Sequence, residues 1–177
     1  MAKEFAGRTV VVTGGTGALG AAVVARLIKE GATCHVPTSH AKAPECFPFA
    51  GNRRVRLATG VDVGDAASVE AFYAAIPDLW ASVHAAGAFA MSPVGEDNAK
   101  AFGDIMDANA RTAFLCSHAA VRVMRASDTA GRIVNVTARP ALEARKGAGM
   151  SAYAASKAAV AALTVALAEE LKGDGIL

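Results

Sequence analysis

Eight residues near the start of the chain, Thr13–Gly20, constrain its fold more than any other stretch. Their sequence is Thr-Gly-Gly-Thr-Gly-Ala-Leu-Gly, and its last three glycines fit the spacing G-x-G-x-x-G. The largely β-branched run at 8–12 predicts a buried strand before them, and the helix formers at 21–30 predict a helix after them. Glycine allows a sharp turn and a close approach to phosphates, which the N-terminus of a helix attracts. The stretch therefore predicts a dinucleotide site, and an ordinary glycine-rich turn is the simpler alternative.

Apolar runs and helical patterns alternate along the rest of the chain. The predicted strands are residues 8–12, 32–36, 54–63, 80–85 and 131–137. The predicted helices are residues 21–30, 65–76, 98–125 and 152–172, with Asp65 as an N-cap, a bend near Gly103 and loops at 44–51 and 139–150. This alternation predicts parallel strands joined by right-handed crossovers. We therefore expect an α/β fold: a Rossmann-type doubly wound parallel sheet with helices on both faces, formed by a single dinucleotide-binding domain over residues 1–177.

The composition argues against several other classes of protein. Of the 177 residues, 53% are hydrophobic, as parallel strands buried on both faces require. The net charge is only +2, without a basic stripe, so nucleic acid is not an expected partner. Cys34, Cys46 and Cys116 lack metal-ligand spacing, which predicts reduced thiols in a cytoplasmic protein and no metal site. The longest apolar stretch near the C-terminus, 158–168, is too short to span a bilayer, so no membrane partner is expected.

The residues after the second predicted strand bear on the choice of cofactor. In a dinucleotide fold, an acidic residue at this point binds the 2′-hydroxyl of the NAD ribose. Here no acidic residue occurs between that strand and Glu45. The small hydroxyl side chains of Thr38 and Ser39, with His40 and Lys42 as possible cations, leave room for a 2′-phosphate. We therefore predict NADP, with NAD as the alternative, although a plain polar loop would carry the same residues.

Tyr153 and Lys157 lie four residues apart at the start of the last predicted helix, in Tyr-Ala-Ala-Ser-Lys. This spacing places both side chains on one helical face. A phenol ordinarily has a pKa of about 10, and a neighbouring ammonium favours the ionised form of such a group. Such a pair can donate or accept the proton that accompanies hydride transfer to a carbonyl. Taken alone, the pair would also suit an amphipathic helix with one tyrosine and one exposed lysine.

Together these patterns resemble the short-chain dehydrogenase/reductase (SDR) family over essentially the whole chain. The resemblance rests on Thr13-Gly14-x-x-Gly17-x-x-Gly20, Asp62-Val63, His84-Ala85-Ala86-Gly87, Asn109, Gly131-Arg132-Ile133-Val134-Asn135 and Tyr153-x-x-x-Lys157. It implies an NAD(P)(H)-dependent oxidoreductase that transfers hydride between the nicotinamide and a small carbonyl or alcohol substrate. It also implies a homodimer or homotetramer that associates through the two long helices.

The resemblance assigns a role to each matching residue. In that family the tyrosine, here Tyr153, is the acid/base, and the lysine, here Lys157, favours the ionised phenol and holds the nicotinamide ribose. An asparagine, here Asn109, supports a proton-relay water, so these three residues are the candidate catalytic group. The candidate cofactor-binding residues are Gly14, Thr16, Gly17, Ala18, Leu19, Gly20, Thr38, Ser39, Asp62, Val63, Ala85, Ala86, Gly87, Tyr153 and Lys157. Among them Asp62 is expected at the adenine, and Gly87 is expected to lie against the cofactor.

Two departures from the family pattern bear on the chemistry. His84 begins a segment that is usually Asn-Asn-Ala-Gly, and we expect it to be a buried, hydrogen-bonded histidine rather than a cofactor contact. Ala138 stands where the family usually has a catalytic serine at the end of strand five. Thr137 would point to the opposite face of a regular strand, unless a bulge redirects it. Loss of such a hydrogen-bond donor commonly costs about 10²–10³ in rate.

Ala138 leaves two hypotheses open. The strings at 14–20 and 138–143 are similar to those of dihydropteridine reductase-like members of the family, which lack the serine and reduce a quinonoid ring. The substrate would then be quinonoid rather than a simple ketone. Alternatively, the chain is a cofactor-binding regulatory or catalytically impaired member of the family.

The C-terminal end of the sequence is short by the family pattern. Family members continue past the last long helix with two more strands and a mobile substrate lid. Here the sequence ends at Leu177, and Ile176-Leu177 predicts the start of another strand. We therefore expect a chain that is truncated at its C-terminus, without the last strands and the lid.

Overall fold

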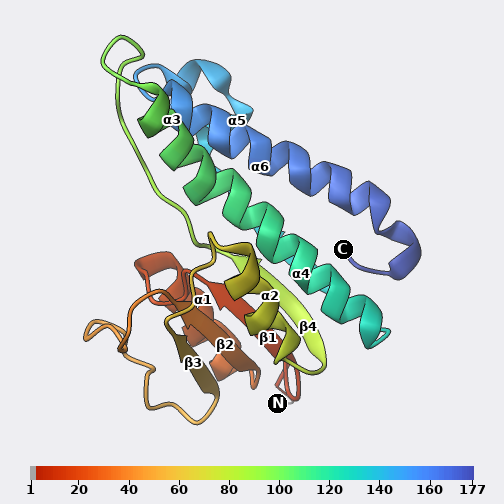
Figure 1. Cartoon of the computed structure of the whole chain (residues 1–177). Helices are drawn as coiled ribbons and strands as arrows, with labels where there is room; N and C mark the ends of the chain where they lie inside the picture. Colours follow the sequence, from red (N-terminus) through yellow and green to blue (C-terminus); the bar gives the residue numbers. More distant parts are fainter. Residues whose placement is uncertain (1–2) are drawn as a thin grey trace.

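A computed structural model describes residues 3–177, and its centre is one all-parallel sheet of five strands. The strands are β1 (Thr9–Thr13), β2 (Thr33–Thr38), β3 (Val55–Thr59), β4 (Leu79–His84) and β5 (Arg132–Asn135). Their spatial order is β3-β2-β1-β4-β5, so the direction of winding reverses between β1 and β4. Figure 1 shows this arrangement, which is the Rossmann-type doubly wound sheet predicted from the sequence.

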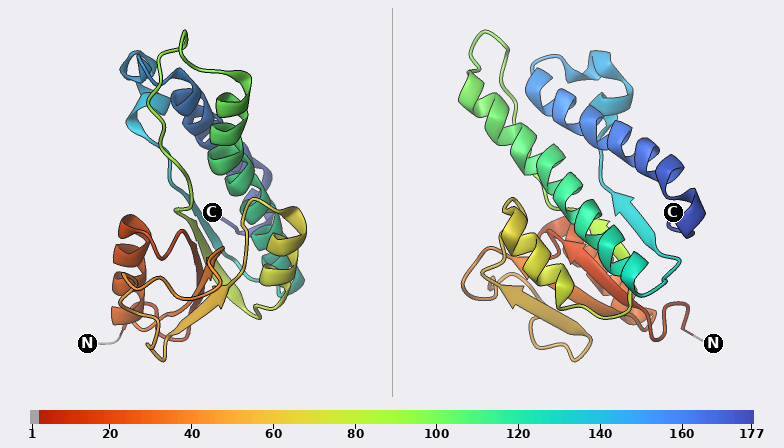
Figure 2. Two further views of the ribbon diagram at one scale, coloured as in Figure 1. Left: turned by 60° about the vertical axis from the view of Figure 1, so that its left-hand side comes forward. Right: turned by 45° about the vertical axis from the view of Figure 1, so that its right-hand side comes forward.

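Helices cover both faces of the sheet (Figure 2). Helix α1 (Ala18–Lys29) lies on one face, and α2 (Ala66–Ala74), α4 (Thr112–Ala126) and α6 (Ser151–Glu170) lie on the other. Helix α3 (Ala99–Met106) precedes α4, and α5 (Arg139–Leu142) precedes α6. Three shorter turns complete the chain: a π-helical turn at Asp107–Arg111 and 3₁₀ turns at Ala144–Gly147 and Lys172–Asp174.

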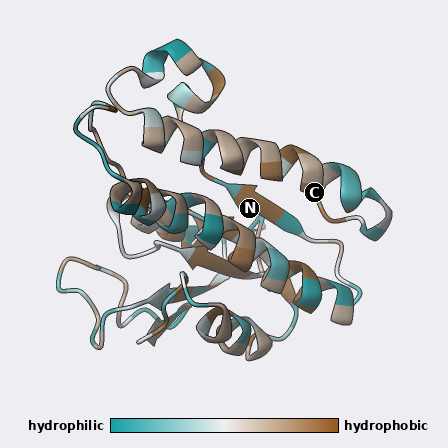
Figure 3. Cartoon of the chain, turned by 45° about the horizontal axis from the view of Figure 1, so that its top comes forward, coloured by the Kyte–Doolittle hydropathy of each residue, from teal (hydrophilic) through white to brown (hydrophobic). Residues whose placement is uncertain are grey.

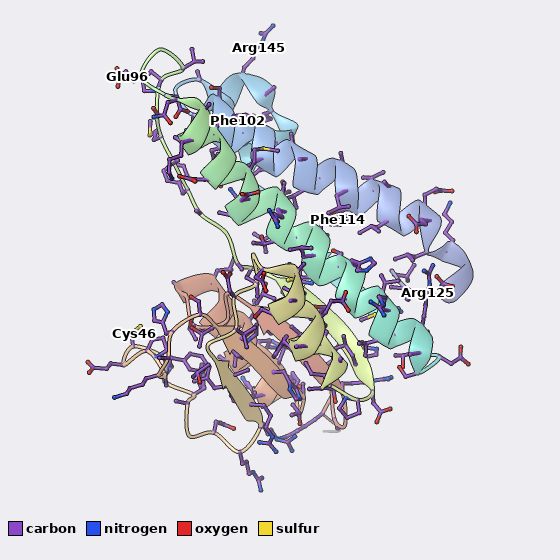
Figure 4. All side chains as sticks on the ribbon, viewed as in Figure 1. Cys46, Glu96, Phe102, Phe114, Arg125 and Arg145 are labelled. Carbon is purple, nitrogen blue, oxygen red and sulfur yellow. The ribbon has the colours of Figure 1, made fainter. Side chains whose placement is uncertain are left out.

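Two apolar clusters hold the helices to the sheet, one on each face. Alternate residues of β1 point to opposite faces, so Val11 enters the cluster under α2 and α4, and Val10 and Val12 enter the cluster under α1. Phe47, in the loop between β2 and β3, is 3% exposed and closes the second cluster. Figure 3 shows the hydrophobic strands enclosed between more polar helices. At the end of the sheet opposite the carboxyl ends of the strands, Arg125 of α4, labelled in Figure 4, forms an ion pair with Asp174, which follows α6.

The structure corrects three of the predicted boundaries. The strand predicted at 54–63 ends at Thr59, because Gly60 turns the chain with a φ of +72°. Strand β2 continues through Pro37, where it pairs with β3 alone and needs no donor toward β1. The helix predicted at 98–125 is interrupted at Asp107–Arg111 rather than near Gly103.

Other expectations about the chain hold or change in detail. Asp65 caps α2 as predicted, because its carboxylate accepts a hydrogen bond from the Ser68 N–H at 2.7 Å. The segment predicted as a loop at 139–150 instead contains α5 and a 3₁₀ turn. Leu177 bonds along the outer edge of β5, where its N–H donates to the Gly131 carbonyl at 3.1 Å. The last residues therefore begin to pair with the sheet, as Ile176-Leu177 predicted.

Residues 158–168 were expected to be too short to span a bilayer, but they are part of a longer apolar helix, α6. The whole helix has 20 residues and, by length and composition alone, is apolar enough to cross a bilayer. In the structure its N-terminal half packs beside α3 and α5 and carries the buried side chains of Ser156 and Lys157. Length and composition are weak evidence here, because core helices often meet the same criterion.

The glycine turn gives a direct test of the close packing between β1 and α1. A Cβ at Gly20 would collide with the carbonyl of Gly14, whereas a Cβ at Gly17 would lie 3.4 Å from that carbonyl, an ordinary contact. We expect Gly20→Ala to lower the free energy of unfolding by about 1–3 kcal/mol or more, because overpacking strains the turn. The matched Gly17→Ala should cost less than about 1 kcal/mol. Urea unfolding measures both, and equal losses would contradict the packing argument.

Candidate active site

The glycine turn connects β1 to α1 with its backbone exposed. Gly14 has a φ of +64°, and the Gly17 N–H donates to the Gly14 carbonyl at 3.0 Å, which closes the turn. Helix α1 begins after Gly17, and no side chain caps its N-terminus. Free N–H groups and the positive end of the helix dipole are therefore directed toward the strand tips.

A cavity of about 390 Å³ lies along the carboxyl ends of β1, β2 and β4, beside the turn. Ten of its lining residues are candidates from the sequence: Gly14, Thr16, Gly17, Thr38, Ser39, Asp62, Val63, Ala85, Ala86 and Gly87. Pro37, His40 and Val61 line it as well. Ala18, Leu19 and Gly20 lie in the first turn of α1, outside this lining. Most of the predicted cofactor-binding residues therefore line one cavity, at the carboxyl ends of the strands where the direction of winding reverses.

Asp62 lies on the rim of this cavity. Its Oδ1 accepts a hydrogen bond from the Gly64 N–H at 2.8 Å, and its own N–H donates to Ser68 Oγ at 3.0 Å. A neighbouring hollow of about 250 Å³ shares Asp62 and continues to Asp107 and Thr112. The carboxylate is therefore fixed by local backbone bonds at the place where the two hollows meet.

Asn109 is held inside the π-helical turn between α3 and α4. The side chain is 1% exposed. Its Nδ2 donates to the Ala88 carbonyl and to Ser156 Oγ, each at 3.0 Å, and its Oδ1 accepts from the Ala88 N–H at 2.9 Å. Asn109 thus ties the segment after β4 to α6. Sequence reasoning missed Ser156 as its partner, although Ser156 is the polar residue next to Lys157.

Lys157 is buried behind Gly87, which lines the cavity, and is not itself one of the lining residues. Its Nζ donates to the Val136 carbonyl at 3.1 Å, and burial lowers the pKa of this lysine. A Cβ at Gly87 would lie 3.3 Å from Nζ and 2.5 Å from Asn109 Oδ1. A glycine at position 87 therefore leaves room for Asn109 and Lys157 to pack directly behind the cavity lining.

Tyr153 lies one helical turn before Lys157 and is half-buried. Its ring packs edge-on against Phe89, with 5.0 Å between the ring centroids. Within the described residues 3–177, its hydroxyl is not hydrogen-bonded to Lys157, whose Nζ is occupied by Val136. The spacing therefore brings the two residues to one end of α6 without a direct bond between them.

Ala138 and Thr137 follow β5, which ends earlier than predicted, at Asn135. The Thr137 hydroxyl donates to the Lys157 carbonyl at 2.7 Å. Ala138 has extended backbone angles and precedes α5. Thr137 therefore helps to hold α6 and does not supply the hydroxyl that Ala138 lacks.

His84 is buried and hydrogen-bonded, as expected from the sequence. The side chain is 3% exposed. Its Nδ1 lies 2.7 Å from Asn135 Oδ1, and its Nε2 lies 2.8 Å from Ser82 Oγ. It points into the core rather than toward the cofactor cavity.

Comparison with known proteins agrees with this geometry. The sequence profile of the short chain dehydrogenases matches residues 8–177. The chain belongs to the short-chain dehydrogenase family. It shares 34% identity with the 2-dehydro-3-deoxy-L-rhamnonate dehydrogenase (NAD⁺) of Sphingomonas sp. strain SKA58, over 99% of this chain and 71% of that protein. It shares 28% identity with an NADPH-dependent aldehyde reductase-like protein of Arabidopsis thaliana, over 97% and 70% of the two chains.

A third relative shows how varied this family is. The 3β-hydroxysteroid dehydrogenase of Mediterraneibacter gnavus shares 31% identity, over 98% of this chain and 64% of that protein. The chain thus spans about two thirds of the length of the curated relatives it matches. Membership in the short-chain dehydrogenase family places it among the NAD(P)-dependent oxidoreductases.

The buried histidine of this short-chain dehydrogenase predicts a pH-dependent stability. Burial lowers the pKa of His84 from its ordinary 6.5 to about 4. Between these two pH values the unfolded chain binds a proton on His84 that the folded chain does not, so stability falls as the pH falls. Above pH 6.5 the neutral His84 costs the folded protein no stability. By pH 4 the free energy of unfolding has fallen by about 3 kcal/mol on account of this histidine.

Urea unfolding of the wild type and of His84→Asn measures this contribution. Between pH 7 and pH 4.5 the wild type should lose about 2–3 kcal/mol more than the variant, because the other titrating groups are common to both. Equal losses in the two proteins would contradict the pKa of about 4 for His84.

Proposed function

We propose that this chain is an NADP(H)-dependent reductase that transfers hydride between the nicotinamide and a small carbonyl, alcohol or quinonoid substrate. The observation that carries the proposal is that Lys157 and Asn109 lie directly behind Gly87, a residue that lines the cavity at the carboxyl ends of the strands. Because Gly87 has no side chain, the buried ammonium of Lys157 and the hydrogen-bonded amide of Asn109 lie close to its backbone. This combination suits a reacting nicotinamide better than a structural turn.

The cavity fits a dinucleotide along its length. The uncapped N-terminus of α1 and the bare backbone of Gly14 and Gly17 suit the pyrophosphate. Asp62 and Val63 would hold the adenine, with Ala85 and Ala86 beneath the cofactor. Ala18, Leu19 and Gly20 form the helical turn that orients the N–H groups. When bound, the dinucleotide supplies or accepts the hydride.

The proton that accompanies hydride transfer is proposed to be handled by Tyr153, with support from Lys157 and Asn109. The Tyr153 hydroxyl gives its proton to the substrate oxygen in reduction and takes one back in oxidation. The Lys157 ammonium is buried, so water screens its charge poorly, and this charge would act on the reacting end of the site. Both Nδ2 hydrogens of Asn109 bond to Ala88 and Ser156, so this side chain supports the site by fixing the segment after β4 against α6.

We expect Tyr153→Phe to lower turnover by about 10²–10⁴, because it removes the proton donor and leaves the ring packed against Phe89. The dissociation constant for NADPH should stay within about threefold, because the glycine turn is unchanged. Steady-state kinetics and a fluorescence titration measure the two quantities. Unchanged turnover in the variant would rule out this mechanism.

The preference for NADP rests on the end of β2. Thr38 and Ser39 line the cavity beside His40, and Asp62 is the one acidic residue among the described lining residues. A 2′-phosphate would therefore meet hydroxyls and a histidine rather than a carboxylate. The names of the Sphingomonas and Arabidopsis relatives point to different cofactors, NAD⁺ and NADPH, so the local residues carry this proposal.

A carboxylate at the end of β2 should reverse this preference. We expect Thr38→Asp to raise the dissociation constant for NADPH at least tenfold, by repulsion of the 2′-phosphate, and to change that for NADH much less. Ala41→Asp adds the same charge three residues later, outside the cavity lining, and is the matched control. Equal effects of both variants on both cofactors would contradict the assignment.

Ala138 favours a substrate that does not require the family serine. A quinonoid ring is already electron-poor and accepts hydride readily. Its reduction would therefore depend less than that of a ketone on a serine hydroxyl that donates to the substrate oxygen. A second candidate function also rests on Ala138: a regulatory protein that binds the cofactor without turnover. NADPH binding without turnover on ketones or a quinonoid dihydropterin, together with no gain from Ala138→Ser, would favour that second function.

We also propose self-association through α4 and α6. Phe114, labelled in Figure 4, is 53% exposed and Val165 is 73% exposed. A hollow of about 290 Å³ is lined by Phe114 and Leu167. Burial of these side chains against a second copy would form a homodimer or homotetramer. Light scattering should then show a dimer or tetramer that Phe114→Glu dissociates, and a monomeric wild type would refute the proposal.

A further inference from the structure

A chain of polar side chains crosses the core from α2 to α6 and takes no direct part in the proposed reaction. It runs through two neighbouring strands, β4 and β5. Its successive heavy-atom distances are 2.7, 2.8, 2.7, 3.0 and 2.7 Å. In order, its members are Tyr73, Ser82, His84, Asn135, Thr164 and the backbone carbonyl of Val160.

The direction of this chain follows from its α6 end. The Val160 carbonyl can only accept, so the Thr164 hydroxyl donates to it and must accept from the Asn135 amide. Asn135 then presents its Oδ1 to His84 Nδ1. Because that oxygen also only accepts, His84 must carry its hydrogen on Nδ1.

The other half of the chain matches this tautomer. A neutral His84 with hydrogen on Nδ1 accepts at Nε2, so the Ser82 hydroxyl donates to it and the Tyr73 hydroxyl donates to Ser82. The titratable groups facing this part of the core are Tyr73 and Cys116. Burial raises the pKa of both, that of Cys116 to about 12, so neither carries charge at neutral pH. Ser117 Oγ lies 3.5 Å from Nδ1 and is neutral.

The chain ends at the helix that carries the site. Three consecutive residues at the end of β5 bond to α6: Asn135 to Thr164, the Val136 carbonyl to Lys157 Nζ, and Thr137 to the Lys157 carbonyl. The first of these bonds depends on the orientation of the Asn135 amide. His84 fixes that orientation from the opposite side.

We propose that His84, as the neutral Nδ1–H tautomer, is a positioning residue: through Asn135 and Thr164 it sets how α6 lies on β5, and thereby where Tyr153 and Lys157 stand. The inference rests on the proposed function, because it assigns α6 the reacting side chains. It accounts for the histidine at a position where the family usually has asparagine.

Two substitutions of His84 separate this role from simple filling of the core. The amide nitrogen of asparagine lies where Nδ1 lies, so His84→Asn keeps the donor to Asn135. The amide of glutamine reaches toward Ser82 instead, so His84→Gln loses that donor. We expect kcat within about threefold of the wild type for His84→Asn, and a fall of tenfold or more for His84→Gln. KM for NADPH should change by no more than about threefold in both, because the glycine turn that would hold the pyrophosphate is remote.

Thr164→Val tests the last link with nearly the same side-chain shape. It should lower kcat as much as His84→Gln does, and the double variant should lose no more than either single variant. Thr129→Val is the matched control, because its hydroxyl bonds to Ser127 on the surface, and it should leave kcat unchanged. Equal kcat for Thr164→Val and Thr129→Val, or equal losses for the two His84 variants, would overturn the proposal.

Nitrogen-15 NMR of the histidine rings tests the tautomer without any turnover. The signal that disappears in His84→Asn should show a protonated Nδ1 and a bare Nε2 at pH 7. A protonated Nε2, or a fully protonated ring, would overturn the proposal. If the wild type reduced no substrate, the proposed function would fail, whereas this spectrum and the amide exchange of α6 in Thr164→Val would still decide whether the chain positions the helix.

Discussion

Contacts between bare backbones, possible only at glycine, hold the site together. A Cβ at Gly14 would lie 2.6 Å from the Ala86 nitrogen, and one at Gly20 would collide with Gly14. The turn after β1, the start of α1 and the end of β4 therefore approach as closely as backbones can. At Gly87 the close neighbours are instead the side chains of Asn109 and Lys157. The room for a dinucleotide at the switch point therefore depends on the absence of side chains at Gly14, Gly20 and Gly87.

The sequence predicted the sheet, most of the cavity lining and the placement of Tyr153 and Lys157, because these depend on local patterns. Boundaries that depend on long-range contacts were wrong. The interruption at Asp107–Arg111 arises where Asn109 reaches Ala88 and Ser156, and the Thr112 hydroxyl bonds to the carbonyls of that turn. Helical periodicity in the sequence cannot reveal these hydrogen-bond partners. A glycine such as Gly103 can be read directly from the sequence, which is why the bend was predicted there.

Thr137 shows why the chemistry was harder to predict than the fold. Strand alternation placed it on the face opposite to the family serine, but β5 ends at Asn135, two residues before it. The hydroxyl bonds to the Lys157 carbonyl and so belongs to the attachment of α6. Asn135, Val136 and Thr137 each hold α6 by a different group. The segment where the family pattern places a serine here bonds to α6, the helix that carries Tyr153.

The most direct test of this account follows NADPH oxidation by the purified chain at the nicotinamide absorbance, with ketones and, separately, with a quinonoid dihydropterin. The account predicts oxidation that requires one of these substrates and is faster with NADPH than with NADH. Turnover on the quinonoid compound alone would identify Ala138 as an adaptation to that substrate. Tight binding of NADPH without oxidation by either class would contradict the assignment of Tyr153 and Lys157 as a working acid/base pair.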